Sequence, residues 1–242
     1  MNASAPPPRA KGDAGARDFV RYLFWHLRPE WRRQSQQDRA AQADEFVGRV
    51  EQPPEGVAVR TYSTVGAKVG VDGLLWMVSS RLEAFQEFEG RLRGSDLSGY
   101  LDWPFGFLGL TQRSQYLGGH AHARQEGPRV RPSGRPYLFV YPFVKKRAWY
   151  GLPFEERRRI MGEHFQIGHK FPDVEIHTGY SLGLDDPEFI LAFESDSPGE
   201  FLDLVSALRP SEASRYTELE TPIFTCVAAT PRRMVELAAG LP

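Results

Sequence analysis

The chain has 242 residues, of which 41% are hydrophobic and 12% aromatic, so it can bury a large core and is not a disordered protein. Thirty basic and thirty-one acidic residues give a formal charge of -1, which provides no long-range attraction to nucleic acid or to an anionic membrane. The single cysteine, Cys226, excludes an internal disulfide framework and a cysteine-based metal site, and its apolar neighbours indicate a buried thiol in a reducing compartment.

The N-terminal residues 1–17 are rich in alanine, proline and glycine and contain no apolar segment of signal-peptide length. We expect them to form a disordered tail. No stretch of the chain approaches ~18 consecutive apolar residues, the length needed to span a bilayer. We therefore expect a cytoplasmic protein without a membrane span.

The first half of the chain predicts the element order β-α-β-β-α. Aromatic and aliphatic residues at 19–27 are typical of a strand, and the charged segment 31–50 has a strongly helical composition that Pro53 and Pro54 end. Two further strands, 57–65 and 74–80, read as a hairpin, and a helix with an apolar inner face follows at 82–92.

The second half repeats that order. It predicts a strand at 136–141, a helix at 154–170, a hairpin from 174–182 and 189–194, a helix at 201–208 and a last strand at 222–228. The letters also repeat, since the residues that follow Gly70 align with those that follow Gly183. We therefore predict an α+β fold in which two tandem ferredoxin-like repeats, 18–117 and 136–242, pack sheet against sheet as a dimeric α+β barrel within one chain.

Between the repeats, the stretch 94–135 contains many glycines and prolines and reads as a long irregular loop, with 118–135 as the connecting loop proper. Its length alone indicates a functional role.

Two histidines of the second repeat are predicted to face the interface between its helix and its strands. His164 falls on the same side of the predicted helix as Ile160, and His177 lies in the alternating run 174–178. On residues alone, a histidine at such a position is more often a satisfied core side chain than a ligand. His169, five positions beyond His164, is expected at the surface.

Five ordered blocks of the second half carry a family resemblance. They are Y-P-F-V-K-K-R from Tyr141 with Trp149-Tyr150 just beyond, Glu163-His164, Gly183-Leu-Asp-Asp186, L-R-P-S-E-A-S-R-Y from Leu208, and Pro222-Ile-Phe224. Together they resemble the chlorite dismutase-like haem family, and in particular its coproheme decarboxylase branch. The first half matches mainly by architecture.

The resemblance implies roles for four of these residues. His164 matches the ligand of the haem iron, because a neutral imidazole binds iron through one nitrogen and donates its other N–H to an acceptor. Glu212 stands where the family places that acceptor. Tyr141 matches the tyrosine that relays oxidation to a propionate of the substrate. Trp149 matches a tryptophan near the porphyrin.

Two neighbouring residues remain candidates for the position on the far side of the iron. Chlorite dismutases carry an arginine there, and this position aligns with either Ile176 or His177, which argues against efficient chlorite chemistry. His177, if it faces the iron, would be a catalytic base that deprotonates peroxide. If Ile176 does, His120 or His122 are candidates for that role.

The same resemblance suggests how the porphyrin carboxylates are held. Arg209, Ser214 and Lys145 are the first candidates, because buried carboxylates need cation or hydroxyl partners. Arg124, Arg129 and Arg131 are weaker ones.

The resemblance implies an enzyme for which iron coproporphyrin III is substrate and redox centre, with haem b as product and hydrogen peroxide as oxidant. The family also implies a homo-oligomer, usually a pentamer. The alternatives are a chlorite dismutase or general haem peroxidase, a non-catalytic haem carrier or sensor, and a scaffold that has lost haem.

Overall fold

The computed structural model describes residues 17–116, 130 and 132–241. Its strands are β1 (Phe19–Leu27), β2 (Val57–Ser63), β3 (Gly73–Ser79), β4 (Leu101–Thr111), β5 (Tyr137–Lys145), β6 (Val174–Tyr180), β7 (Phe189–Ser195), β8 (Thr217–Leu219) and β9 (Phe224–Ala228). The α-helices are α1 (Gln36–Glu51), α2 (Leu82–Arg93), α3 (Arg147–Gly151), α4 (Phe154–Gly168), α5 (Pro198–Leu208) and α6 (Pro231–Ala239). Three short 3₁₀-helices, η1 (Pro29–Arg33), η2 (Leu97–Tyr100) and η3 (Glu212–Tyr216), complete the described elements.

The strands form one nine-stranded antiparallel sheet in the order β7-β6-β4-β1-β3-β2-β9-β5-β8. Strand β5 also pairs with β7, so the series of pairings returns to the strand from which it began. The two halves of the chain join at two short pairings, β4 with β6 and β2 with β9, each of two residue pairs. The predicted α+β class is confirmed.

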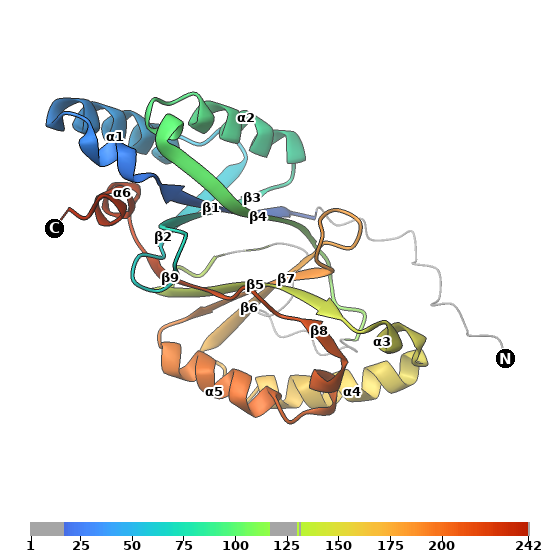
Figure 1. Ribbon diagram of the computed structural model, residues 1–242. Helices are drawn as coiled ribbons and strands as arrows, with labels where there is room; N and C mark the ends of the chain where they lie inside the picture. Colours follow the sequence, from blue (N-terminus) through green and yellow to red (C-terminus); the bar gives the residue numbers. More distant parts are fainter. Residues whose placement is uncertain (1–16, 117–129, 131, 242) are drawn as a thin grey trace.

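Helices cover the sheet on two opposite sides (Figure 1). Helices α1 and α2 of the first half, together with α6 from the C-terminal end of the second half, lie over β1 to β3, whereas α4 and α5 lie over β5 to β7. Strand alternation explains this arrangement, because each strand presents one set of side chains to its own helices and the other set to the opposite half.

The faces that point away from the helices meet in a shared core. Both halves contribute to it, and the rings of Phe24 and Phe224 stack there with centroids 4.1 Å apart. Cys226 is fully buried in this core, as its apolar neighbours predicted.

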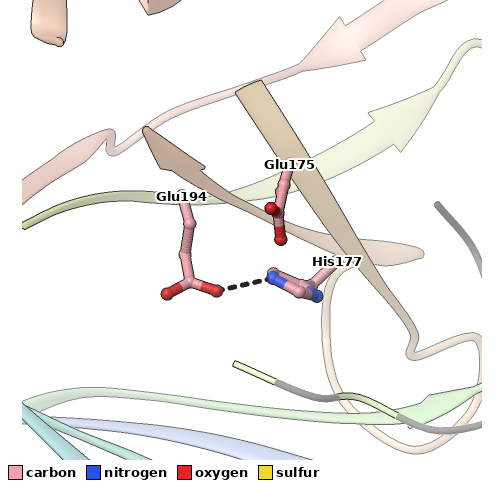
Figure 2. A group of neighbouring side chains, drawn as sticks. All are labelled: Glu175, His177 and Glu194. Carbon is pink, nitrogen blue, oxygen red and sulfur yellow. Dashed lines mark hydrogen bonds and ion pairs between the residues drawn. The ribbon is translucent and has the colours of Figure 1, made fainter. Parts of the chain in front are cut away.

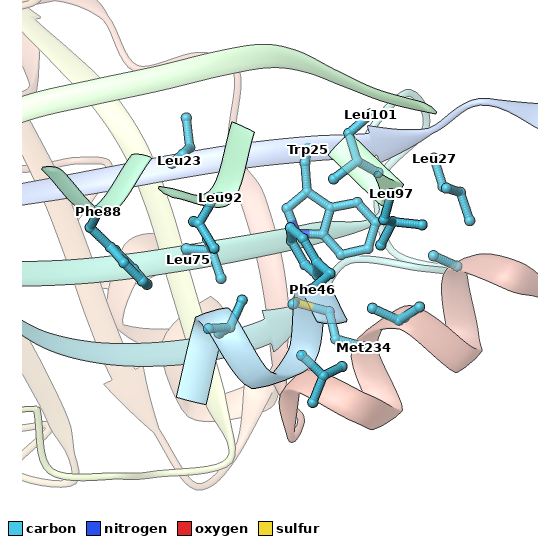
Figure 3. Close-up of a cluster of buried hydrophobic side chains, with 14 of the residues drawn as sticks. Leu23, Trp25, Leu27, Phe46, Leu75, Phe88, Leu92, Leu97, Leu101 and Met234 are labelled. Carbon is cyan, nitrogen blue, oxygen red and sulfur yellow. The ribbon is translucent and has the colours of Figure 1, made fainter. Parts of the chain in front are cut away.

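A second core fills the space between the first-half strands and their helices (Figure 3). Trp25, Phe46 and Phe88 are almost fully buried there, together with leucines and Met234 from α6. Burial of each such side chain contributes roughly 1.5–3 kcal/mol relative to exposure.

The prediction of a long loop over 94–135 is wrong at residues 101–111, which form β4. This strand pairs along most of β1, from Phe19↔Leu110 to Leu27↔Leu101. Pro104 and two glycines weakened its strand pattern, and the partner strand supplies the hydrogen bonds that local propensity did not indicate.

The helix α6 was also not predicted, although its boundaries carry clear signals. The hydroxyl of Thr230 accepts a hydrogen bond from the N–H of Arg233, Pro231 begins the helix, and Gly240 ends it with φ +71°. In the described part of the chain, no helix has the length and apolar character that a membrane span requires.

Candidate functional site

Side chains that alternate in direction along β5, β6 and β7 line a cavity between these strands and helices α4 and α5. Tyr141, Ile176 and Leu191 point toward α4 and α5, whereas their neighbours Val140, His177 and Ala192 point away from these helices. The space that aromatic side chains fill in the first half is therefore partly open in the second.

This cavity has a volume of about 670 Å³. Its walls come from β5 to β7, α4, α5 and η3, and the chain after β4 contributes Gln112, Ser114 and Tyr116. Seven of the nine predicted site residues line it, namely Tyr141, Lys145, Trp149, His164, Ile176, Arg209 and Ser214. A cavity of this size with mainly apolar walls and a few polar groups is typical of a small-molecule or cofactor site.

His164 projects from α4 into the cavity, one turn after the buried Ile160. Burial, and to a lesser degree the positive charge of Lys145, lower the pKa of His164 to about 4. Its imidazole is therefore neutral near pH 7 and keeps a lone pair that can bind a metal.

Lys145 and Trp149 form one corner of the cavity. The Lys145 ammonium lies 4.7 Å from the centroid of the Trp149 ring and 5.2 Å from that of Phe143, which places it against two aromatic faces. Burial lowers the pKa of Lys145 to about 8, against the opposing effect of Glu188.

Tyr141 lies on β5 with its ring stacked on that of Phe193, at a centroid distance of 5.9 Å. Burial and then the negative charge of Glu220 raise the pKa of its phenol well above the usual value, while Arg209 opposes them. Tyr141 therefore keeps its hydroxyl proton at physiological pH.

Arg209 and Ser214 stand at the cavity wall. The guanidinium of Arg209 donates to the carboxylate of Glu220, which also lines the cavity. A ligand carboxylate would therefore compete with Glu220 for Arg209. Ser214 lies in η3, which borders the same wall.

The structure separates the two candidates on β6. Ile176 lines the cavity, whereas His177 points into the opposite interior, where its Nε2 lies 2.8 Å from Oε2 of Glu194 (Figure 2). Trp76 of the first half packs against the His177 ring, with centroids 5.2 Å apart. The prediction of His177 as a catalytic base in this cavity is therefore not supported by its position, because neighbours on a strand face opposite ways.

Among the described residues no hydrogen bond joins Glu212 to His164, its predicted partner. Its carboxylate accepts a hydrogen bond of 2.7 Å from Arg159 on α4, and it does not line the cavity that contains His164. Arg159 and His164 lie on different sides of α4, and Glu212 is paired with the exposed Arg159.

Some cavity residues were not predicted. His169 was expected at the surface, and it is exposed, yet it also lines the cavity. Arg17, assigned to the tail, lines it as well and donates from Nε to the carbonyl of Thr111. Nothing in the sequence around Arg17 indicated a cavity residue, because it lies at the end of a low-complexity segment. His120, His122, Arg124, Arg129 and Arg131 lie outside the described residues.

A helix-covered antiparallel sheet and a mainly apolar cavity lined by His164 define the class, an α+β protein with a cavity of the size usual for cofactor sites. The chlorite dismutase family model matches residues 37–229, and on this match the chain belongs to the chlorite dismutase family. A coproheme decarboxylase from Mycolicibacterium smegmatis (strain ATCC 700084 / mc(2)155) is 34% identical over 227 residues, which cover 92% of this chain and 95% of that protein.

Solved structures share the fold. A mutant chlorite dismutase from Candidatus Nitrospira defluvii superposes with a TM-score of 0.83 at 23% identity, covering 92% of this chain and 95% of the other. The chlorite dismutase of the same organism in complex with imidazole gives 0.82 at 23% identity, with the same coverage of both chains.

Proposed function

We propose that the protein catalyses the peroxide-dependent oxidative decarboxylation of iron coproporphyrin III to haem b. The observation that carries the proposal is that His164 and Tyr141, a neutral imidazole and an oxidisable phenol, line the same cavity. The 34% identity to a coproheme decarboxylase over 92% of the chain supports the choice of substrate. In each of two steps a propionate becomes a vinyl group and CO₂ with release of two electrons and a proton, and one H₂O₂ takes up these electrons, that proton and one proton from solvent to give two water molecules.

The cavity fits an iron porphyrin in its chemistry. About 670 Å³ lies within the range of roughly 300–1,000 Å³ that is usual for cofactor sites. The neutral imidazole of His164 would hold the iron, and the aromatic rings of Phe193 and Trp149 offer faces for a flat ring. Lys145, Arg209 and Ser214 would meet its carboxylates.

When bound, the iron porphyrin would supply the oxidising power. Tyr141 would relay it, because a buried, protonated phenol can lose an electron together with its proton and can then take a hydrogen atom from a nearby propionate. Ile176 on the cavity wall is apolar and offers no ligand atom of its own at that position.

The proposal is tested by adding iron coproporphyrin to the protein, titrating hydrogen peroxide and following the porphyrin masses. We expect the successive loss of two carboxyl groups. Tyr141→Phe should bind the porphyrin but convert it more than about 100-fold more slowly, a loss of about 2.7 kcal/mol of transition-state stabilisation. Tyr137→Phe, on the same strand but outside the cavity lining, is the matched control. Unchanged porphyrin masses with the wild-type protein would refute the proposal.

A chlorite dismutase or general haem peroxidase is the nearest alternative, and the isoleucine at 176 argues against the first because it cannot hold an oxyanion. A haem carrier or sensor would need His164 but not Tyr141. The Tyr141→Phe variant separates these, since a carrier would keep its function.

We further propose that the two halves are tandem ferredoxin-like repeats that close into one barrel. The strand orders β4-β1-β3-β2 and β6-β7-β5-β9, and the additional pairing of β5 with β7, support it. We also propose a homo-oligomer, a pentamer by family resemblance, which sedimentation of the purified protein would test.

A further inference from the structure

Glu188 is a buried carboxylate that the proposed reaction does not use. It immediately precedes β7 and is only 7% exposed. Its Oε2 accepts a hydrogen bond of 2.8 Å from the peptide N–H of Lys145 and one of 2.6 Å from the hydroxyl of Tyr150. Its own peptide carbonyl accepts from the N–H of Ser181, so both ends of the residue are fixed. A carboxylate held in this way has little freedom to turn toward solvent.

Among the described residues Lys145 has no acid within ion-pair distance, whereas Arg209 in the same cavity is paired with Glu220. Its Nζ makes one long contact, 3.4 Å to the carbonyl of Ala213, and otherwise lies over the two aromatic rings. Glu188 bonds the main chain of Lys145 rather than its ammonium. The acid therefore provides negative charge near the lysine without occupying its hydrogen-bond donors.

The titratable groups that act on this ammonium come from three elements. Glu188 before β7 favours the charged lysine, and His164 on α4 repels it only when protonated, which its low pKa prevents near pH 7. Tyr150 on α3 stays neutral because burial and its hydrogen bond to Glu188 raise its pKa.

We propose that Glu188 is a positioning residue that keeps Lys145 charged and free to bind a carboxylate of an anionic tetrapyrrole. The inference rests on the proposed function for the identity of the ligand, but not for the behaviour of the lysine. Tyr150 holds Glu188 in place, and the carboxylate in turn holds the last residue of β5 through the Lys145 N–H.

The first test measures the ionisation of Lys145 without any ligand. The chain has five lysines, so ¹³C-lysine NMR gives few signals, and Lys145→Met assigns the one of interest. We expect Glu188→Gln, which keeps the size and the acceptor oxygen, to lower the pKa of Lys145 by about one unit. Asp186→Asn, an exposed acid two residues away, should leave it unchanged. An unchanged pKa in Glu188→Gln would overturn the proposal, whatever the enzyme's reaction.

The second test uses binding of metal-free coproporphyrin, followed by its fluorescence. We expect Glu188→Gln to bind about fivefold more weakly at pH 8, where its lysine is mostly neutral, and nearly as well as wild type at pH 6. A merely structural role would weaken binding equally at both pH values, and that result would also overturn the proposal.

Lys145→Arg keeps Glu188 in place and remains informative if Glu188→Gln does not fold. Because arginine stays protonated, its affinity for coproporphyrin should not change between pH 7 and 9, whereas that of the wild type should fall. A wild-type affinity that is flat over this range contradicts the inference. Failure of any protein to bind porphyrin counts against the proposed function, and the NMR result then decides the inference alone.

Discussion

Among single residues, His164 has the most consequential environment. Because its pKa is about 4, its lone pair is available over the whole physiological range. We expect the affinity of the protein for iron coproporphyrin to stay nearly constant from pH 7 to pH 5, measured by the absorbance of the bound porphyrin. A histidine with an ordinary pKa near 6.5 would lose affinity more than tenfold over that range.

Replacing His164, the proposed iron ligand, should give a complementary result. His164→Ala should lose the absorbance band of an imidazole-bound iron, and added imidazole should restore it, because the cavity left by the side chain can admit the free ligand. His169→Ala is the matched control, since His169 lies at the exposed edge of the same cavity. Loss of the band in the control but not in His164→Ala would contradict the assignment.

His177, which was predicted as a catalytic base if it faces the iron, lies outside the cavity and contacts the buried Glu194. Burial alone would raise the pKa of Glu194, but hydrogen bonds from His177 and from the N–H groups of Ser133 and Gly134 outweigh it, so the pKa is lowered. The stabilisation is present above the unfolded-state pKa of 4.5 and is lost as pH falls through the lower folded value.

Glu194→Gln should therefore destabilise the protein by about 1–3 kcal/mol at pH 7, and by less at pH 4. Urea denaturation at the two pH values measures the difference. The exposed Glu218→Gln should cost little at either pH. A penalty that is the same at pH 4 and pH 7 would exclude an ionised Glu194 as its source.

Sequence reasoning reached the correct helix for His164 and the correct strand for Tyr141, because 3.6-residue and two-residue periods are local properties. It could not choose between Ile176 and His177, since alternation tells that they face opposite ways but not which way is inward. The pairing of Glu212 with His164, which the family resemblance implies, stays a prediction, and only the folded structure shows that Glu212 accepts from Arg159.

At the scale of elements, the junction of β4 with β6 depends on two glycines. A Cβ on Gly109 would lie 3.0 Å from Cα of Gly179, and both are strand backbone that cannot turn aside. This close approach lets the two strands pair across the halves of the chain.

Gly109→Ala should accordingly cost about 1–3 kcal/mol of unfolding free energy, through the overpacking of this junction. Gly90→Ala provides the control, because nothing lies within 4 Å of a Cβ in that helix and alanine favours helix by about 1 kcal/mol. Thermal unfolding of the two variants should give shifts of opposite sign. A stabilised Gly109→Ala would show that the strands have room to separate.

The paired strands and covering helices predicted for each half agree with the described elements where the apolar pattern was strong, as at 73–79 and 189–195. β4 escaped prediction because long-range pairing with β1 overrides its weak local pattern. The order of strands in the sheet is a tertiary property that local patterns do not contain, and the tandem-repeat arrangement inferred from the internal similarity of the two halves stays a prediction.

For the whole molecule, the difference between the two helix–sheet layers decides where a ligand can bind. The first layer is filled by Trp25, Phe46 and Phe88, and the second is hollow. Phe88→Ala should lower stability by about 3–5 kcal/mol with or without ligand.

Leu204→Trp, which adds a ring to the cavity wall, tests the hollow layer. Iron coproporphyrin at 100 times its dissociation constant should stabilise the wild-type protein by about 2.7 kcal/mol. The variant should lose most of this gain, while Phe88→Ala keeps it, as urea denaturation with and without porphyrin would show. Equal stabilisation of all three proteins would place the ligand elsewhere.

The joints between the halves have a consequence for assembly. Each joint has only two residue pairs, Leu110↔Tyr180 with Thr111↔Gly179 and Tyr62↔Ala228 with Ser63↔Val227, so few backbone hydrogen bonds hold the halves together. The halves are held together mainly by the shared apolar core, to which the stacked rings of Phe24 and Phe224 belong. Two separately synthesised fragments, divided between β4 and β5, would then associate through an apolar surface rather than through strand edges. Their association would weaken on cooling.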